Sequence, residues 1–146
     1  MRIFLDANIL FSAAKSAGAI RHLLLNLGSN GQNFIVDEYV TTEARRNLSN
    51  KANQDAIQYF ETLLLQLEVN PVQHQLRRAG STAKESTEWL PEKDRPVLLA
   101  AIALKCDALV TGDRTHFGAG YGKTFGGVTI YSPAQLAQAL FAKPQI

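Results

Sequence analysis

The sequence predicts an α/β fold: a three-layer α/β/α sandwich with a central, mostly parallel sheet of four or five strands. Short apolar runs rich in β-branched and aromatic residues, which favour buried strands, alternate with longer stretches whose apolar residues recur every three or four positions, as in helices. This alternation is typical of a parallel sheet, because neighbouring parallel strands need a crossover connection. At this length we expect residues 1–146 to form a single domain.

The composition is that of an ordinary globular protein, with 46% hydrophobic residues, 19% charged residues and a net charge of +2. The slight positive charge is compatible with a polyanionic partner without requiring one. A lone cysteine, Cys106, excludes an internal disulfide and fits a reducing compartment. No apolar stretch reaches the length of a membrane-spanning helix, and no signal-peptide pattern is present. We therefore expect a cytoplasmic protein with no membrane partner.

The predicted elements follow one another in the order that a parallel sheet requires. In the amino-terminal half we expect a strand at residues 3–5, helices over 8–15 and 20–27, a strand at 34–36, and helices over 40–48 and 57–67. In the carboxyl-terminal half we expect an edge strand at 69–72, a helix over 97–104, strands at 108–110 and 128–131, and a helix over 132–140. The polar segment 74–91 predicts a short helix or a loop, and a glycine-rich loop runs to Gly127.

Four acids stand out because of where they fall relative to these elements. Asp6 directly follows the first strand, and Asp113 lies just past the strand at 108–110. Asp94 opens the most apolar helix, and Glu43 interrupts an apolar helical face. Ligands of open parallel sheets bind outside the carboxyl ends of the strands, where the following helices also start. We therefore expect the four carboxylates to share one pocket.

Each of these acids also has an ordinary structural explanation. Asp94 would cap its helix, Asp113 would form a turn in Gly-Asp-Arg, and Glu43 would pair with a polar neighbour on a solvated face. Asp6 is the hardest to explain in this way, because a charge at the end of a buried strand is costly unless a positive group lies beside it.

Carboxylates crowded into one pocket repel one another, which raises their pKa values unless a cation neutralises them. Hard divalent ions prefer carboxylate oxygens, so Mg²⁺ or Mn²⁺ is the expected cofactor. Such an ion lowers the pKa of a water molecule and clamps a phosphodiester for in-line attack.

Four motifs together resemble those of PIN-domain ribonucleases: IFLDANIL at residues 3–10, EARRNL at 43–48, KDRPVLLAAIA at 93–103 and LVTGDRTHF at 109–117. They span essentially the whole chain, and the order and type of the four acids agree with the family. The resemblance implies a PIN-like sandwich and a Mg²⁺- or Mn²⁺-dependent endoribonuclease. By the family's pattern, the metal-binding and catalytic residues are Asp6, Glu43, Asp94 and Asp113.

The same resemblance extends to neighbouring residues and to partners. Asn8 and Thr111 are similar to the polar residues that flank the family's acid site. Many small bacterial members are VapC-type toxins of toxin–antitoxin pairs, which form dimers and are inhibited by a protein encoded beside them. The resemblance therefore implies RNA as the substrate, a cognate antitoxin and a homodimer. The polar segment 74–91 does not match the family's pattern.

A nuclease also needs positive groups that hold phosphates. Such groups lie beside each acid motif, although basic residues next to acids are also common on ordinary surfaces. The candidate substrate-binding residues are Arg45, Arg46, Lys51, Lys93, Arg95, Arg114 and His116. His116 could donate a hydrogen bond to a phosphate or take part in proton transfer.

Two other functions are compatible with parts of the sequence. A phosphatase or receiver-like domain would use Asp6 as its nucleophile or phosphoacceptor, but such phosphatases usually place a second aspartate where this chain has Asn8. A non-catalytic PIN-like module would bind RNA or a protein partner, yet a degenerate member would be expected to lose at least one of the four acids. The glycine-rich stretch at 118–124 lacks the spacing and the following helix of a P-loop, so we exclude a nucleotide site there.

Overall fold

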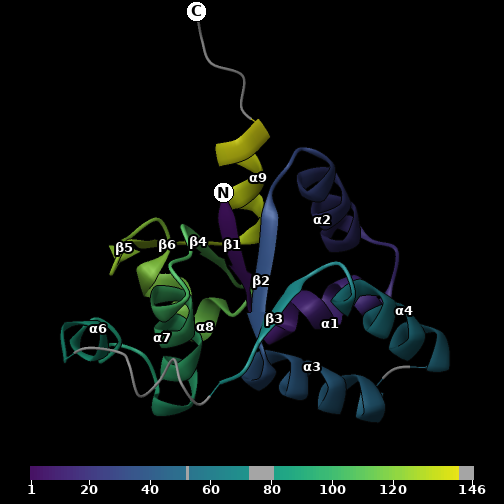
Figure 1. Cartoon of the computed structure of the whole chain (residues 1–146), viewed down its shortest axis with the longest axis horizontal. Coiled ribbons are helices and arrows are strands. Elements are labelled where there is room, and N and C mark those ends of the chain that lie inside the picture. The colour runs from purple at the N-terminus through teal and green to yellow at the C-terminus, as the bar shows by residue number, and fades with distance from the viewer. Residues whose placement is uncertain (52, 73–80, 142–146) are drawn as a thin grey trace, which may run out of the picture.

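The chain folds around a six-stranded sheet in the order β3-β2-β1-β4-β6-β5 (Figure 1), seen in a computed structural model that describes residues 1–51, 53–72 and 81–141. The strands are β1 (Arg2–Leu5), β2 (Asn33–Asp37), β3 (Glu68–Asn70), β4 (Ala108–Val110), β5 (Thr124–Phe125) and β6 (Val128–Tyr131). All neighbours pair in parallel except β5, which runs antiparallel to β6. The predicted α/β class with a mostly parallel sheet is confirmed.

The predicted number of four or five strands is too low, because a short strand forms inside the glycine-rich region. Thr124 and Phe125 pair with Thr129 and Val128, and the two threonine hydroxyls lie 2.8 Å apart. Gly126 and Gly127 turn the chain between the strands, with φ angles of 57° and 86° that other residues rarely adopt. A two-residue strand is too short to show an alternating pattern, which is why the sequence reads as a loop.

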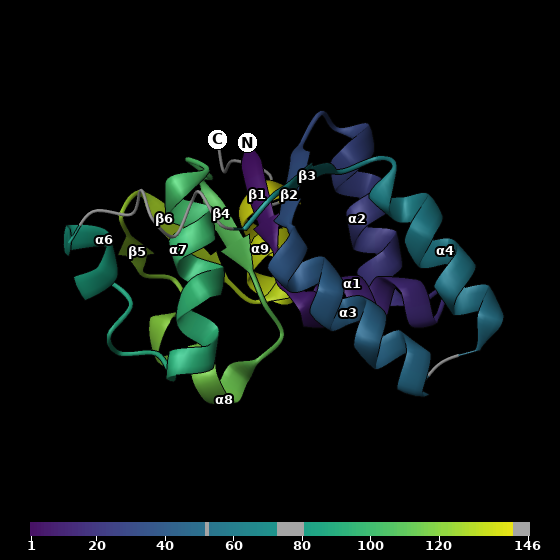
Figure 2. The ribbon, with the colours of Figure 1, turned by 60° about the horizontal axis from the view of Figure 1, so that its bottom comes forward.

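Helices flank the sheet and complete the predicted three-layer sandwich. They are α1 (Ala7–Lys15), α2 (Ala19–Ser29), α3 (Glu38–Lys51), α4 (Gln54–Leu64), α6 (Ser81–Glu85), η1 (Glu92–Asp94), α7 (Arg95–Ala103), α8 (Arg114–Phe117), η2 (Gly118–Gly120) and α9 (Pro133–Phe141). Figure 2 shows α7 in front of the sheet and α9 behind it. None of the described helices is long and apolar enough to cross a membrane.

The order of the strands creates a switch point between β1 and β4. From β1 the chain moves outward through β2 to β3, and it then returns to the other side of β1 to form β4. Leu5 pairs with Val110 at the end of this contact, and the backbone N–H of Asp6 donates to the carbonyl of Val110 at 3.1 Å. The residues that follow the two strands therefore emerge side by side, where ligands of doubly wound sheets bind.

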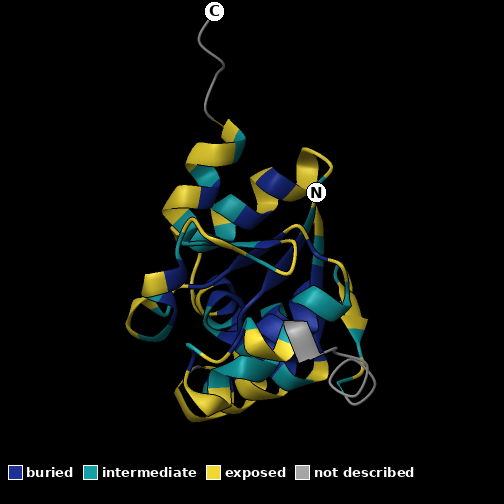
Figure 3. Ribbon diagram, turned by 90° about the vertical axis from the view of Figure 1, so that its left-hand side faces the viewer, coloured by how far each residue is buried: buried dark blue, intermediate teal, exposed yellow. Residues whose placement is uncertain are grey.

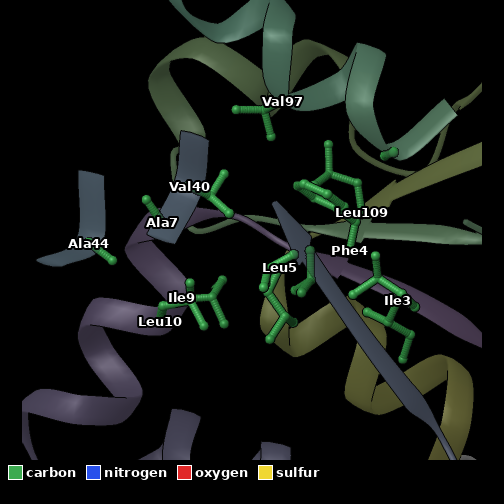
Figure 4. Packing of buried hydrophobic residues seen from close by; sticks show 14 of the residues in the cluster. Ile3, Phe4, Leu5, Ala7, Ile9, Leu10, Val40, Ala44, Val97 and Leu109 are labelled. Atoms are coloured by element: carbon green, nitrogen blue, oxygen red, sulfur yellow. The ribbon is translucent and has the colours of Figure 1, made fainter. Parts of the chain in front are cut away.

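The core lies between the sheet and the helices on both of its faces. Buried residues occupy the sheet and the inner sides of the helices, whereas the outer helical surfaces are exposed (Figure 3). Phe4 and Leu109 point toward Val97 of α7, whereas Ile3 and Leu5 point to the opposite face (Figure 4). The sequences of the central strands are continuous apolar runs because helices cover both faces of the sheet.

The segment 74–91 was predicted as a short helix or a loop, and its described part contains the short helix α6 and an aromatic anchor. Residues 73–80 lie outside the described residues, and the chain from 81 onward forms α6 and a turn. Trp89 stacks on Phe125 with ring centroids 4.9 Å apart and meets Phe117 edge-on at 6.3 Å. Leu90 is fully buried beside them. This packing fixes the stretch that leads into η1 and α7.

Candidate active site

The side chain of Asp6 is held rigidly at the carboxyl end of β1. Oδ1 accepts a hydrogen bond from the backbone N–H of Ala7 at 2.8 Å, which caps α1. Oδ2 accepts hydrogen bonds from the Thr111 hydroxyl at 2.7 Å and from the Asn8 side-chain amide at 3.2 Å. Asp6 is 5% exposed, and these three bonds replace part of the hydration that its carboxylate loses.

Asn8 and Thr111 join the ends of β1 and β4. The Asn8 amide also contacts the Thr111 hydroxyl at 3.2 Å, and its Oδ1 accepts from the backbone N–H of Gly112 at 2.8 Å. The Thr111 hydroxyl accepts from the backbone N–H of Asp113 at 3.1 Å. The two residues predicted to flank the acid site thus link Asp6 to the loop that carries Asp113.

Asp113 and Asp94 meet at the side chain of His116. Asp113 caps the single turn α8, because its Oδ1 accepts from the backbone N–H of His116 at 3.1 Å. Its Oδ2 lies 2.8 Å from His116 Nδ1, and Asp94 Oδ2 lies 3.0 Å from the same nitrogen. Asp94 makes no side-chain capping bond to α7, so the capping explanation for this residue is wrong. Its carboxylate turns toward the loop after β4 instead.

Glu43 is an exposed residue of α3 that lines the same cleft as Asp94 and Asp113. The helix is fixed near the site by Tyr39, whose hydroxyl donates to the carbonyl of Lys93 at 2.6 Å. That bond ties α3 to the residue before Asp94. Tyr39 was not among the predicted site residues, because an aromatic residue in the first turn of a helix ordinarily indicates packing.

All four predicted acids line a single cleft of about 410 Å³. Asp6 and Asn8 come from the end of β1 and the start of α1, Glu43 from α3, and Asp94 and Asp113 from the two ends of the α7–β4 unit. Their shared location follows from the switch point in the sheet. The assignment of metal-binding and catalytic roles to them stays a prediction.

Two lysines line the same cleft, whereas several of the candidate arginines are engaged elsewhere. Lys51 and Lys93 contribute to the cleft wall. Arg45 pairs with Glu61 at 2.9 Å, and Arg95 donates to the carbonyls of Leu90 and Glu88. Arg46 lines a neighbouring hollow together with Glu43, and Arg114 is exposed at the start of α8. The structure therefore brings Lys51 and Lys93 to the acids more directly than it brings these arginines.

Burial and repulsion from neighbouring carboxylates raise the pKa values of Asp6 and Asp94. The pKa of Asp6 rises from an ordinary 3.8 to about 6, chiefly because burial penalises its charged form. The bonds from Thr111 and Ala7 oppose this rise, and the charges of Glu43 and Asp94 add to it. Burial also raises the pKa of Asp94, against the lowering influence of Lys93 and His116. A cation in the cleft would offset all of these penalties.

Asp37 shows that the same sequence pattern has two structural outcomes. Like Asp6, it ends a buried strand, and burial raises its pKa to about 6. Its Oδ1 accepts from the backbone N–H of Val40 at 3.2 Å and so caps α3. It does not line the acid cleft. Asp37 was not among the predicted site residues, although it ends a buried strand as Asp6 does.

A larger cavity of about 550 Å³ lies elsewhere, among residues of α2, α4, β2 and β3. Glu68 is the only carboxylate among its described lining residues, and it pairs with Arg2 at 3.2 Å. Arg21 in this cavity stacks on Tyr59 and donates to the carbonyls of Ala13 and Ala14. Because its charged groups already have partners, size alone does not make this cavity the better candidate for chemistry.

A family model of the PIN domain matches residues 4–129, a range that contains all four acids. The chain belongs to the PIN domain family. The membership predicted from the four motifs is thereby confirmed. No curated protein matches the sequence of this PIN domain at a significant level.

Solved structures of similar fold include two VapBC structures and the VapC20 toxin. VapBC2 from Rickettsia felis, bound to a DNA fragment from its promoter, has a TM-score of 0.68 and 17% identity, and the match covers 90% of this PIN domain and 98% of that chain. VapBC-1 from nontypeable Haemophilus influenzae has a TM-score of 0.61 and 16% identity, with coverage of 92% and 99%. VapC20 from Mycobacterium tuberculosis, a toxin that cleaves the sarcin–ricin loop, has a TM-score of 0.57 and 13% identity, with coverage of 84% and 98%. Identities this low show a shared fold alone.

Proposed function

We propose that this PIN domain is a divalent-metal-dependent endoribonuclease that hydrolyses RNA phosphodiester bonds. The observation that carries the proposal is the meeting of Asp6, Glu43, Asp94 and Asp113 in one cleft whose wall includes Lys51 and Lys93. Carboxylates suit a hard cation, and lysines suit the phosphates of a polyanion. The combination is what metal-assisted phosphodiester hydrolysis requires.

The donor set fits Mg²⁺ or Mn²⁺. Asp94 Oδ2 is a buried oxygen that forms no hydrogen bond within the described parts of the chain, and burial raises the pKa values of both Asp6 and Asp94. A bound divalent ion would remove both penalties, and it would supply an activated water and stabilise the charge that develops on the scissile phosphate. Asp94, Asp113, Asp6 and Glu43 would hold it.

Other residues in the cleft and behind it have distinct tasks in this proposal. Thr111 and Asn8 keep the Asp6 carboxylate in one orientation, so that its charge is placed before substrate arrives. Lys51 and Lys93 would contact the phosphates on either side of the scissile bond. Tyr39 keeps Lys93 at the cleft by holding its carbonyl.

The phosphatase or receiver-like alternative is disfavoured by the residue beside Asp6. Asn8 stands where such phosphatases usually place a second aspartate, and it bonds to Asp6 and to Gly112. The non-catalytic alternative predicts RNA or protein binding without cleavage.

The experiment that tests the proposal compares the wild-type protein with Asp6→Asn on a mixed panel of labelled RNAs, with Mg²⁺, Mn²⁺ or EDTA. We expect cleavage only by the wild type, only with metal, and a decrease of at least about 100-fold in the variant. His22→Asn, at an exposed position on α2 outside the cleft, serves as the control. Cleavage that survives EDTA, or equal cleavage by Asp6→Asn, would refute these roles. Binding without cleavage would establish the non-catalytic module.

We also propose that this PIN domain is the toxin of a toxin–antitoxin pair and forms a homodimer in the cytoplasm. The support is its similarity in fold to the VapBC structures, together with the family resemblance. Light scattering should give twice the mass of one chain, and co-expression with the product of the adjacent gene should yield a complex that no longer cleaves RNA. A monomer that no neighbouring gene product inhibits would contradict this proposal.

A further inference from the structure

The His116 side chain lies between two acids of the cleft, Asp94 and Asp113, and its backbone is held in the turn α8. Its Nδ1 is 2.8 Å from Asp113 Oδ2 and 3.0 Å from Asp94 Oδ2. The position of the residue is set by the turn α8, where its backbone N–H is held by Asp113 Oδ1. Within the described ranges, these three side chains form the group of acids and histidines whose ligand atoms come within 4.8 Å of one another. The three donor atoms therefore converge on one point.

Hydrogen bonding does not account for this convergence. His116 Nδ1 and Asp94 Oδ2 are both fully buried atoms, and neither has a hydrogen-bond partner among the residues that the structure describes. The contacts of Nδ1 with the two carboxylate oxygens have the distances of ion pairs and do not qualify as hydrogen bonds. Buried polar atoms without hydrogen-bond partners are rare and call for an explanation such as an ion. A cation bound by all three atoms supplies one.

The spacing of the three atoms also suits a metal ion. In an octahedral site with metal–ligand distances of about 2.1 Å, adjacent ligand atoms stand about 3 Å apart. The separations of 2.8 Å and 3.0 Å from Nδ1 to the two oxygens match that value. Asp6 and Glu43 lie further away in the same cleft and are not members of this close group.

We propose that His116 Nδ1 is a direct ligand of the divalent ion, beside the carboxylates of Asp94 and Asp113, so that the site prefers Mn²⁺ and the later first-row ions to Mg²⁺. The inference deepens the proposed function and rests on it for the presence of a metal. An imidazole nitrogen binds transition ions well and contributes little to Mg²⁺, which prefers oxygen ligands. The preference for Mn²⁺ over Mg²⁺ thus depends on His116, which is not one of the four acids.

A role for His116 in positioning alone predicts a different behaviour. In that case the ring would only orient Asp94 and Asp113, and a side chain of similar reach that still hydrogen-bonds would replace it. His116→Asn provides such a side chain, because its amide reaches about as far as Nδ1 but offers no imidazole nitrogen. The matched control is His22→Asn, the same substitution at an exposed histidine of α2.

The experiment measures the ligands of bound Mn²⁺ by pulsed electron paramagnetic resonance, which detects a directly coordinated nitrogen, and measures Mn²⁺ and Mg²⁺ affinities by titration. We expect a nitrogen coupling in the wild type and in His22→Asn, and its loss in His116→Asn. We also expect His116→Asn to bind Mn²⁺ about 10-fold more weakly and Mg²⁺ within about 3-fold of the wild type. The wild-type spectrum decides the question even if the variant does not fold.

Each outcome bears separately on the ligand and on the nuclease. Mn²⁺ bound without nitrogen coupling would overturn the role of His116 and leave the metal-dependent nuclease intact. The same holds if His116→Asn keeps the nitrogen coupling of the wild type. No metal binding at all would overturn both proposals. Nitrogen coupling in a protein that cleaves no RNA would support the ligand and refute the nuclease.

Discussion

At the scale of single residues, Asp6 is a carboxylate placed where a charge is unfavourable. It is buried at the end of β1, and its pKa of about 6 lies well above the ordinary 3.8. Three hydrogen bonds hold it without removing the cost of burial. Such sites are typical of functional groups whose charge is neutralised by a ligand. The cost should be visible in the stability of the metal-free protein.

We predict that metal-free wild type loses about 2 kcal/mol of unfolding free energy relative to Asp6→Asn as the pH rises from about 4 to about 8. A carboxylate whose pKa is higher in the folded state than in the unfolded state stabilises the fold when it is protonated. This contribution is complete at pH values below the unfolded pKa of 3.8, and it is lost as the pH rises through the folded pKa of about 6. Asp37, which titrates in the same direction, is present in both proteins and cancels.

The measurement is urea denaturation in EDTA across this pH range, with Asp55→Asn at an exposed site on α4 as the control. The difference between wild type and the control should change little with pH. If the difference between wild type and Asp6→Asn is also flat, the carboxylate is not buried in the way described. Added Mg²⁺ should reduce the loss at high pH, because a bound cation offsets the buried charge.

At the scale of elements, the cleft depends on how the segment before α7 is anchored. The Trp89 ring packs against Phe117, the last residue of α8, and against Phe125, which belongs to β5 of the β5–β6 hairpin. Gly120 permits this contact, because a Cβ atom there would lie 2.4 Å from the Trp89 ring. The glycine is therefore required by close packing, and the anchored segment leads directly to η1 and Asp94.

We predict that Gly120→Ala destabilises the fold by about 1–3 kcal/mol, because a methyl group would force the packed Trp89 ring to move. The control is Gly118→Ala, where the added Cβ would make an ordinary contact at 3.5 Å with Arg114. Thermal unfolding gives the difference, and the emission of the single tryptophan reports the movement of the ring. Equal stability of the two variants would show that the ring is not confined.

At the scale of the whole molecule, the fold places two lysines in the wall of the cleft that contains the four acids. The net charge of +2 is too small to attract RNA strongly by itself. Lys51 on α3 and Lys93 on η1 both line the cleft of the four acids, so two of the positive charges are concentrated there. Phosphate contacts should therefore depend on these two side chains rather than on the overall charge.

We predict that Lys51→Ala weakens the binding of a single-stranded RNA in EDTA and makes its dependence on salt shallower by about 0.7 in the log–log slope, because one phosphate contact is lost. Lys84→Ala removes the same charge from α6, outside the cleft, and should leave the slope unchanged. Fluorescence anisotropy between about 50 and 200 mM salt measures both. An equal change in the two variants would indicate that only net charge matters.

Most of the architecture could be read from the sequence, since apolar runs and helical periodicity are local signals. Every predicted strand is present, and the helices agree with prediction to within a few residues at their ends. The strand β5 was missed because two residues carry no periodicity, and its turn depends on the φ angles of Gly126 and Gly127. The motifs around the four acids were enough to identify the family.

The sequence by itself determined the α/β class, the strand ends that carry Asp6 and Thr111, and membership of the PIN domain family. These follow from burial and from the spacing of residues along the chain. Only the packed chain distinguishes Asp6, which enters the cleft, from Asp37, which caps a helix. Only the packed chain brings Lys51, Lys93 and His116 to the acids while Arg45 and Arg95 bond elsewhere. The physical reason is that a side chain's partner depends on which distant elements the sheet order places beside it, and that information is not local.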